Sequence, residues 1–189
     1  RETMSLTIMN EKALSLAHLS INYREGEKVS IKTAAIYNEA GLKLKSIKMS
    51  EMADRSMVDN ASLYNDARII YYRVIPIKYP FTVVYDYEIS YNSLYGNNFY
   101  SPYLSENQSI EMSELKDNKN KNIPLNIKSF NLPSEVSEIK NDFISSWVFS
   151  NLPPIPEEPM GPPAEKFIPL ISIAPERIQY DNYKGQADT

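Results

Sequence analysis

The stretch that decides the fold is Phe81–Tyr91, FTVVYDYEISY. Apolar and aromatic side chains occupy every second position, namely Phe81, Val83, Tyr85, Tyr87, Ile89 and Tyr91. The intervening positions are polar, with the single exception of Val84. A period of two places the two sets on opposite faces of a β-strand. The stretch therefore predicts a strand of about 35 Å, at about 3.3 Å per residue, with one face buried and the other in water. One wet face favours an antiparallel sheet.

Shorter segments with the same period lie on both sides of this stretch, at residues 4–8, 29–37, 42–49, 69–75, 110–112, 125–127 and 143–149. Asn38–Gly41 predicts a type I turn closed by a left-handed glycine. A phase slip near Ala17–His18 is interpreted as a β-bulge, and residues 54–66 as a loop. Only Ser50–Ala53 suggests a helical turn. The sequence predicts one all-β domain over residues 1–189, with about ten antiparallel strands in a large curved sheet or β-sandwich.

Composition excludes several classes of function. Hydrophobic residues make up 42% of the chain and 14 of its residues are tyrosines, which is typical of a globular protein. The net charge of −4 and the absence of a basic stripe argue against nucleic-acid binding. The chain has no cysteine, so disulfides, thiolate metal ligands and a cysteine nucleophile are excluded. No run of 18 apolar residues is present that would predict a membrane span.

Residues 151–163, NLPPIPEEPMGPP, form a proline-rich loop that holds six of the chain's 13 prolines. Proline lacks an amide donor and fixes φ, so this loop cannot join a central sheet. Two compatible roles follow: a stiff cover over a sheet edge and a rigid lead-out to another domain. Apolar residues resume at Phe167–Ile171, so residues 164–189 are predicted to pack back on the domain before the chain departs.

Side chains able to carry chemistry are few. Adjacent carboxylates such as Glu157–Glu158 rarely converge on one substrate bond. Asp86 and Glu88 share the polar face of one strand, where ordinary surface charge is a simpler interpretation than a cation site. We interpret His18, the single histidine, as structural rather than as a base. The sequence predicts no catalytic residue, no metal site and no cofactor, so this chain is not expected to be an enzyme by itself.

An ordered set of short motifs is similar to one known family. The set comprises LYNDAR (63–68), YPFTV (79–83), YDY (85–87), Trp147, NLP (151–153), EEP (157–159), Pro162–Pro163, Pro169, Ala174–Pro175 and residues 180–185, with NEKA (10–13) and NEAG (38–41) upstream. It resembles the N-terminal β domain of unknown function that precedes a transglutaminase-like domain in exported proteins of the Bacteroidetes. The polar run 115–122 departs from that family, which has a clearer apolar strand there.

The resemblance implies a large antiparallel structure similar to the saddle-like N-terminal domain of gluzincin aminopeptidases. It also implies that the chain is a fragment of a longer exported protein of the periplasm or cell envelope. The catalytic residues of that protein would be a Cys-His-Asp set in the following transglutaminase-like domain. None of them can be placed on this sequence, which lacks cysteine.

Two functions remain open at this point. The first is a non-catalytic accessory domain that packs on and orients a downstream transglutaminase- or peptidase-like domain of the same polypeptide. Its candidate interdomain contacts are Glu157, Glu158, Tyr180 and Tyr183. The second is a β module that binds an envelope glycan or peptide, with Tyr95, Tyr100 and Tyr103 as candidate stacking residues. An independent carboxylate enzyme is a third hypothesis, and it predicts turnover by this chain alone.

Overall fold

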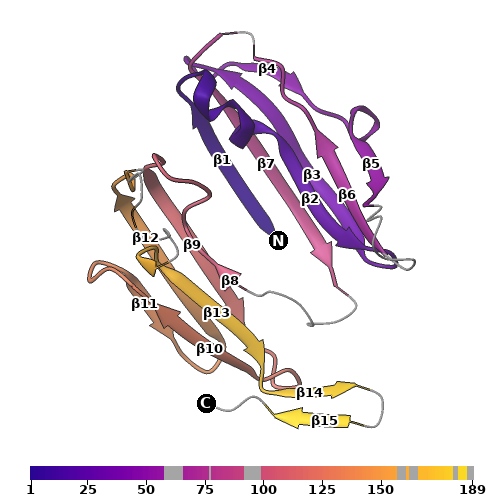
Figure 1. Ribbon diagram of the computed structural model, residues 1–189, viewed down its shortest axis with the longest axis vertical. Helices are drawn as coiled ribbons and strands as arrows, with labels where there is room; N and C mark the ends of the chain where they lie inside the picture. The colour runs from indigo at the N-terminus through magenta and orange to yellow at the C-terminus, as the bar shows by residue number, and fades with distance from the viewer. Residues whose placement is uncertain are drawn as a thin grey trace. The chain divides into compact units, whose positions relative to one another are not determined.

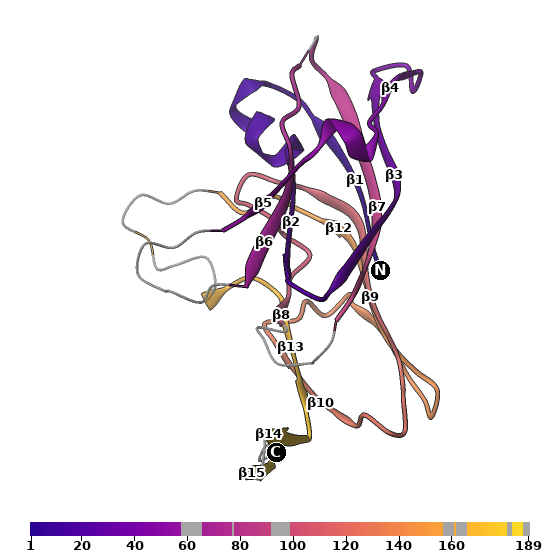
Figure 2. The ribbon, with the colours of Figure 1, turned by 90° about the vertical axis from the view of Figure 1, so that its right-hand side faces the viewer.

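The computed structural model describes residues 1–57, 66–76, 78–91, 99–156, 161, 166–180 and 183–186, and the side chains among these up to Arg177. The chain divides into two compact units, residues 1–93 and 94–189, and each is described by itself. Two compact units can belong to one folding domain, so the single domain over residues 1–189 stays a prediction. Figures 1 and 2 show that both units are built almost entirely from strands.

The larger sheet of the first unit is antiparallel and places the strand predicted from Phe81–Tyr91 between two others. Its order is β1 (Glu2–Ile8), β7 (Phe81–Ser90), β3 (Lys28–Asn38) and β4 (Lys43–Ser46). On β7 the side chains of Phe81, Val83, Tyr85 and Tyr87 are buried, which confirms the alternation. The strand ends at Ser90, and Tyr91 is exposed rather than part of the buried face.

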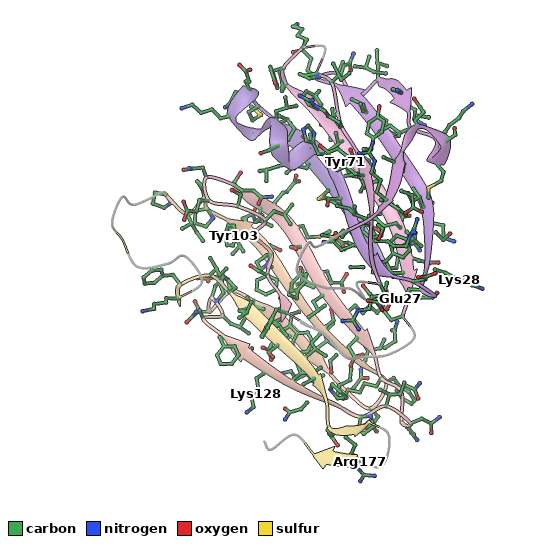
Figure 3. All side chains as sticks on the ribbon, turned by 45° about the vertical axis from the view of Figure 1, so that its right-hand side comes forward. Glu27, Lys28, Tyr71, Tyr103, Lys128 and Arg177 are labelled. Carbon is green, nitrogen blue, oxygen red and sulfur yellow. The ribbon has the colours of Figure 1, made fainter. Side chains whose placement is uncertain are left out.

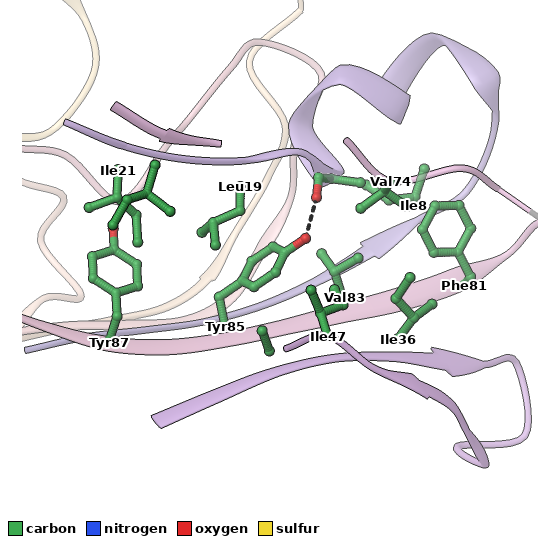
Figure 4. Packing of buried hydrophobic residues seen from close by; sticks show 13 residues of the cluster. Ile8, Leu19, Ile21, Ile36, Ile47, Val74, Phe81, Val83, Tyr85 and Tyr87 are labelled. Atoms are coloured by element: carbon green, nitrogen blue, oxygen red, sulfur yellow. Dashed lines mark hydrogen bonds between the residues drawn. The ribbon is translucent and has the colours of Figure 1, made fainter. Parts of the chain in front are cut away.

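A second sheet of the same unit contributes the other side of its core. It contains β2 (Leu19–Arg24), β6 (Ala67–Tyr72) and β5 (Ala53–Ser56), with β6 in the middle. Figure 4 shows Leu19 and Ile21 of β2 across from Tyr85 and Tyr87 of β7. The predicted loop over residues 54–66 is therefore wrong at its start, where β5 pairs with β6.

An ion pair and a tyrosine hold the polar strand β5 in place. Nη2 of Arg68 lies 2.9 Å from Oδ1 of Asp54, and the Tyr23 hydroxyl donates to the same carboxylate at 2.8 Å. Arg68 thus pairs with Asp54 across the sheet. The three partners lie on three different strands, β2, β5 and β6, so no local sequence pattern predicts their contact.

The segment before β2 is a 3-10 helix, η1 (Glu11–Ala17), and not a bulged strand. The Asn10 side chain begins it by accepting a hydrogen bond from the Lys12 amide at 3.1 Å. Leu14 and Leu16 still pack against the core, because a 3-10 helix can also turn apolar side chains to one side. The Tyr85 hydroxyl donates to the Ala17 carbonyl at 2.7 Å and secures the end of the helix (Figure 4).

The turn between β3 and β4 follows the prediction closely. Gly41 has φ +75°, the left-handed conformation that favours glycine. Its amide donates to the Asn38 carbonyl at 3.0 Å. The Asn38 side chain accepts from the amides of Ala40 and Leu42. A single 3-10 turn, η2 (Met49–Glu51), overlaps the helical turn expected at Ser50–Ala53, but Ala53 already belongs to β5.

The second unit contains two antiparallel sheets of three strands each. One has the order β11 (Ser137–Lys140), β12 (Ile144–Leu152) and β9 (Ile110–Asn118). The other has the order β10 (Leu125–Phe130), β13 (Leu170–Pro175) and β8 (Phe99–Tyr100). Their core centres on Ile110, Trp147, Phe149, Leu152 and Ile171. A hairpin of β14 (Arg177–Tyr180) and β15 (Tyr183–Gln186) follows.

These elements confirm the all-β antiparallel fold class, with the described strands divided among five sheets. The polar run 115–122 begins inside a continuous strand, because β9 pairs with β12 from Ile110 to Asn118. The turn after β9 closes with a bridge between Asn120 and Ile123. Within the described part of the chain, no helix has the length and apolarity needed to cross a membrane.

The described start of the proline-rich loop is tied to the second unit. Strand β12 ends at Leu152, directly before Pro153, so the proline-rich loop predicted from Asn151 begins two residues later than expected. The Tyr103 hydroxyl donates to the Pro153 carbonyl at 2.7 Å. The Asn107 amide donates to the Ile155 carbonyl at 2.8 Å. The first residues of the loop therefore lie against the segment that precedes β9. Further on, β13 pairs with β10 and β8.

Candidate functional site

Two of the three candidate stacking tyrosines lie in the described part of the chain, and both have structural contacts. Tyr100 packs against the core of the second unit, with its ring centroid 6.2 Å from that of Phe149. The Tyr103 ring packs on the same core, and its hydroxyl donates to the Pro153 carbonyl (Figure 3 labels Tyr103). Tyr95 lies outside the described residues. A stacking role for the three stays a prediction.

The candidate interdomain contacts lie mostly beyond what the structure describes. Glu157 and Glu158 fall outside the described residues. The backbones of Tyr180 and Tyr183 are paired with each other in the β14–β15 hairpin, but their side chains lie outside the described part. These contacts also stay predictions.

The carboxylates on the polar face of β7 make ion pairs with cationic side chains. The Arg1 guanidinium donates to both carboxylate oxygens of Asp86, at 2.9 Å and 2.7 Å. This hydrogen-bonded cation holds the pKa of Asp86 below its ordinary value. Glu88 pairs with Lys32 at 3.3 Å. Among the described residues, no group of three His, Asp or Glu side chains converges as a metal site would require.

The described contacts of His18 are structural ones. Its Nδ1 accepts a hydrogen bond from the Val74 amide at 3.3 Å, and its ring lies edge-on to Tyr71 at 6.0 Å. Desolvation, with a smaller contribution from the Arg73 charge, lowers the pKa of His18 below its ordinary value. Protonation at Nδ1 would remove the acceptor that the Val74 amide uses.

This arrangement predicts a stability change near neutral pH. Because the pKa of His18 is lower in the folded chain, the unfolded chain binds a proton first as the pH falls. The stabilisation is complete above the unfolded pKa of about 6.5. We therefore expect the urea midpoint to fall between about pH 7.5 and about pH 5.5, above the range in which carboxyl groups titrate.

A matched variant tests the origin of this change. His18→Asn keeps a side-chain acceptor for the Val74 amide but does not titrate. Its urea midpoint should stay nearly constant over the same pH range. An equal fall in the variant and the natural chain would contradict the assignment to His18.

An exposed apolar patch lies at one end of the first unit, and we call it the Ile75 patch. Ile75 is 78% exposed and Leu44 is 47% exposed. Both line a small pocket of about 120 Å³ whose other lining residues are Ile36, Lys45, Tyr72, Pro76, Lys78 and Phe81. Lys45 pairs with Glu51 at 2.6 Å. Apolar surface that is framed by charged groups in this way is typical of a contact surface.

A larger recess opens in the second unit, and we call it the Trp147 recess. It has a volume of about 450 Å³, which is in the usual range of small-ligand pockets, about 300–1,000 Å³. Its walls come from β9, β11 and β12 of one sheet and from β10 of the other, so it lies between the two sheets. Ser145 and Trp147 line it and are almost fully buried.

Sequence reasoning missed both surfaces. It placed Trp147 in an alternating segment at residues 143–149 and described residues 115–122 only as a polar run. Asp117, Lys119 and Lys121 alternate with asparagines in the sequence, but this pattern predicts only a polar surface and not a recess. The recess forms because these residues meet β10 and β12, which are distant in the sequence. The Ile75 patch had no signal, since Leu44 and Ile75 belong to segments that look like ordinary strands.

Comparison with known proteins places the chain in a family. A domain of unknown function with a solved structure, DUF3857, matches residues 1–156. The chain belongs to this family. Membership agrees with the expected resemblance to a β domain of unknown function. No curated protein matches the DUF3857 chain in sequence.

A solved structure shares the fold of this DUF3857 chain. It is the crystal structure of a "putative protease" from Parabacteroides distasonis, with a TM-score of 0.70 and 17% sequence identity. The match covers 90% of this chain but only 35% of the other chain. At this identity the likeness shows the fold alone. The DUF3857 chain thus spans about a third of the length of the protein that it resembles.

Proposed function

We propose that this DUF3857 chain is a non-catalytic N-terminal accessory domain of an exported transglutaminase- or peptidase-like protein. In this role it packs on the catalytic domain of the same polypeptide and orients it. The observation that carries the proposal is the structural match, in which nearly the whole chain corresponds to 35% of a longer protein. The same fold therefore occurs as one part of a larger chain that is described as a protease.

The ordered motifs resemble those of exported Bacteroidetes proteins, and this resemblance specifies the partner domain and the location. It supports a downstream transglutaminase-like domain as the partner and the periplasm or cell envelope as the location. The organism of the structural match, Parabacteroides distasonis, is in keeping with that source. The catalytic cysteine would then lie in the downstream domain, since the present chain has none.

The Ile75 patch is the described surface best suited to such packing. Ile75 and Leu44 expose large apolar side chains, and covering them would remove apolar area from water. The lysines that line the pocket beside them, Lys45 and Lys78, pair with Glu51 and Glu39 of this chain, so the apolar side chains are the part of the patch left for a partner. We place the interdomain contact here, in addition to the predicted contacts at Glu157, Glu158, Tyr180 and Tyr183.

The test is a charge placed in the patch of the natural full-length protein. Because Leu44→Asp with Ile75→Asp would bury unpaired charges in the contact, we expect the catalytic domain to lose stability and activity. The melting temperature of that domain should fall. Peptide hydrolysis or transamidation should slow by about tenfold or more, which corresponds to about 1.4 kcal/mol in the activation free energy.

The matched control is Met112→Asp. Met112 is exposed on β9 of the second unit, far in sequence from the patch, and the control should leave both measurements unchanged. If the Leu44→Asp, Ile75→Asp variant kept the melting temperature and rate of the natural protein, the Ile75 patch would not be the contact.

A further inference from the structure

The Trp147 recess has properties of a ligand site that the accessory role does not require. Its interior combines the buried Ser145 and Trp147, which are 4% and 1% exposed, with the half-buried Leu125 and Ile127 of β10. Apolar lining residues together with a serine can hold an apolar side chain and orient one polar group.

Charged groups of both signs surround this interior in equal number. The lining residues include Lys119, Lys121, Lys140, Asp117, Asp142 and Glu176. Lys140 pairs with Glu138 at 2.8 Å. Within the described residues, the other five make no ion pair with one another or with a third group. Their charges are therefore available to a ligand that carries both signs.

This balance of charge narrows the class of ligand. Among the five groups without an ion pair, a phosphate or another strong anion would meet the carboxylates of Asp117, Asp142 and Glu176, and a metal ion or polyamine would meet the ammonium groups of Lys119 and Lys121. Lys140 Nζ also stands over the indole ring of Trp147, 5.3 Å from its centroid, so that face of the ring is not free for a sugar to stack on. A ligand with one charge of each sign around an apolar centre fits the lining without repulsion.

The backbone beside the recess favours a peptide among such ligands. Strand β10 is at the edge of its sheet and pairs only with β13 among the described strands. Its other edge presents amide and carbonyl groups that an extended peptide can use. Leu125 and Ile127, two residues apart on this strand, point to the same face and line the recess.

We propose that the Trp147 recess binds a short peptide segment in which charged side chains of opposite sign flank an apolar side chain. The apolar side chain enters between Leu125, Ile127 and Trp147. The flanking carboxylate lies toward Lys119 and Lys121, and the flanking ammonium group toward Asp142 and Glu176. This site is separate from the Ile75 patch and does not depend on the accessory role.

The experiment uses capped tripeptides and the natural fluorescence of the protein. Trp147 is the only tryptophan, so its emission reports on the recess directly. The probe is acetyl-Lys-Leu-Glu-amide, and the controls are the same peptide with both charges replaced by glutamine and with leucine replaced by serine. We expect a saturable change in emission with the probe and a clearly weaker response with either control.

A charge-reversed variant distinguishes specific from unspecific binding. Lys119→Glu with Lys121→Glu leaves the lining strongly acidic, so the Kd for the probe should rise about tenfold through the loss of its two ion pairs. The same variant should bind acetyl-Lys-Leu-Lys-amide more tightly than the natural protein does. Lys43→Glu, on β4 of the first unit, is the matched control and should change neither affinity.

Two results would overturn the proposal. The first is the absence of any saturable change in Trp147 emission, together with unshifted amide NMR signals of Ile127 and Ser145, up to millimolar probe. The second is an equal affinity of the natural protein and the charge-reversed variant for the probe. Binding by all peptides regardless of charge would give that second result.

Discussion

Replacement of Trp147 by alanine is expected to destabilise the second unit by about 3–5 kcal/mol. Trp147 is among the largest fully buried side chains of the described structure, and it joins β12 to the core formed by Ile110, Phe149 and Ile171. Its Nε1–H also donates to Glu138 at 3.1 Å. The substitution removes both the packing and this hydrogen bond, and it leaves a cavity between the sheets.

The measurement is urea unfolding followed by circular dichroism, because the variant has no tryptophan left to report fluorescence. Trp147→Phe is the matched control. It keeps most of the ring volume and loses the bond to Glu138, so its loss should be about 1–2 kcal/mol. A loss below about 1 kcal/mol for Trp147→Ala would show that β12 is not central to the core.

The second large effect is expected at Tyr85 in the first unit. Its ring is fully buried between the two sheets, as Figure 4 shows. Burial raises the pKa of the Tyr85 hydroxyl, so it stays protonated and donates to the Ala17 carbonyl. Tyr85→Ala removes the ring and the hydrogen bond, and should cost about 3–5 kcal/mol in the free energy of unfolding.

Tyr85→Phe separates the two contributions. It keeps the ring but leaves the buried Ala17 carbonyl without its donor, so its loss should be about 1–3 kcal/mol. Hydrogen exchange should show faster opening of η1 in this variant, because the hydroxyl secures the end of that helix. Unchanged exchange in η1 would mean that the hydrogen bond contributes little to holding the helix.

The parts of the fold that the sequence predicted are those with strong local causes. The alternation from Phe81 to Tyr87 predicted the buried face of β7, because every second side chain of a strand points to the same face of the sheet. Asn38 and Gly41 predicted their turn because its dihedral angles suit few other residues. Pro153 marked the end of β12 because proline cannot continue the ladder.

The parts that were missed depend on partners far along the chain. The spacing of Leu14 and Leu16 suits a strand, yet this segment is a 3-10 helix that the Asn10 side chain begins and Tyr85 secures. The polar strand β5 exists because Asp54 meets Tyr23 and Arg68 from two other strands. Such pairings follow from the assembled sheet and leave no local pattern.

The same limit applies to the candidate sites. Aromatic residues such as Tyr100 and Tyr103 stood out in the sequence; their rings pack against the core of the second unit, and the Tyr103 hydroxyl donates to the Pro153 carbonyl. The Trp147 recess and the Ile75 patch consist of residues that are individually ordinary. Only their assembly from several strands gives them the character of a surface for binding.

The most direct test of the accessory role is to compare the natural full-length protein with a form that lacks residues 1–189. The quantities to measure are the melting temperature of the catalytic domain and its rate of peptide hydrolysis or transamidation. We expect the shortened form to melt at a lower temperature and to turn over substrate more slowly. Equal stability and an equal rate in the two forms would contradict an accessory role for this DUF3857 domain.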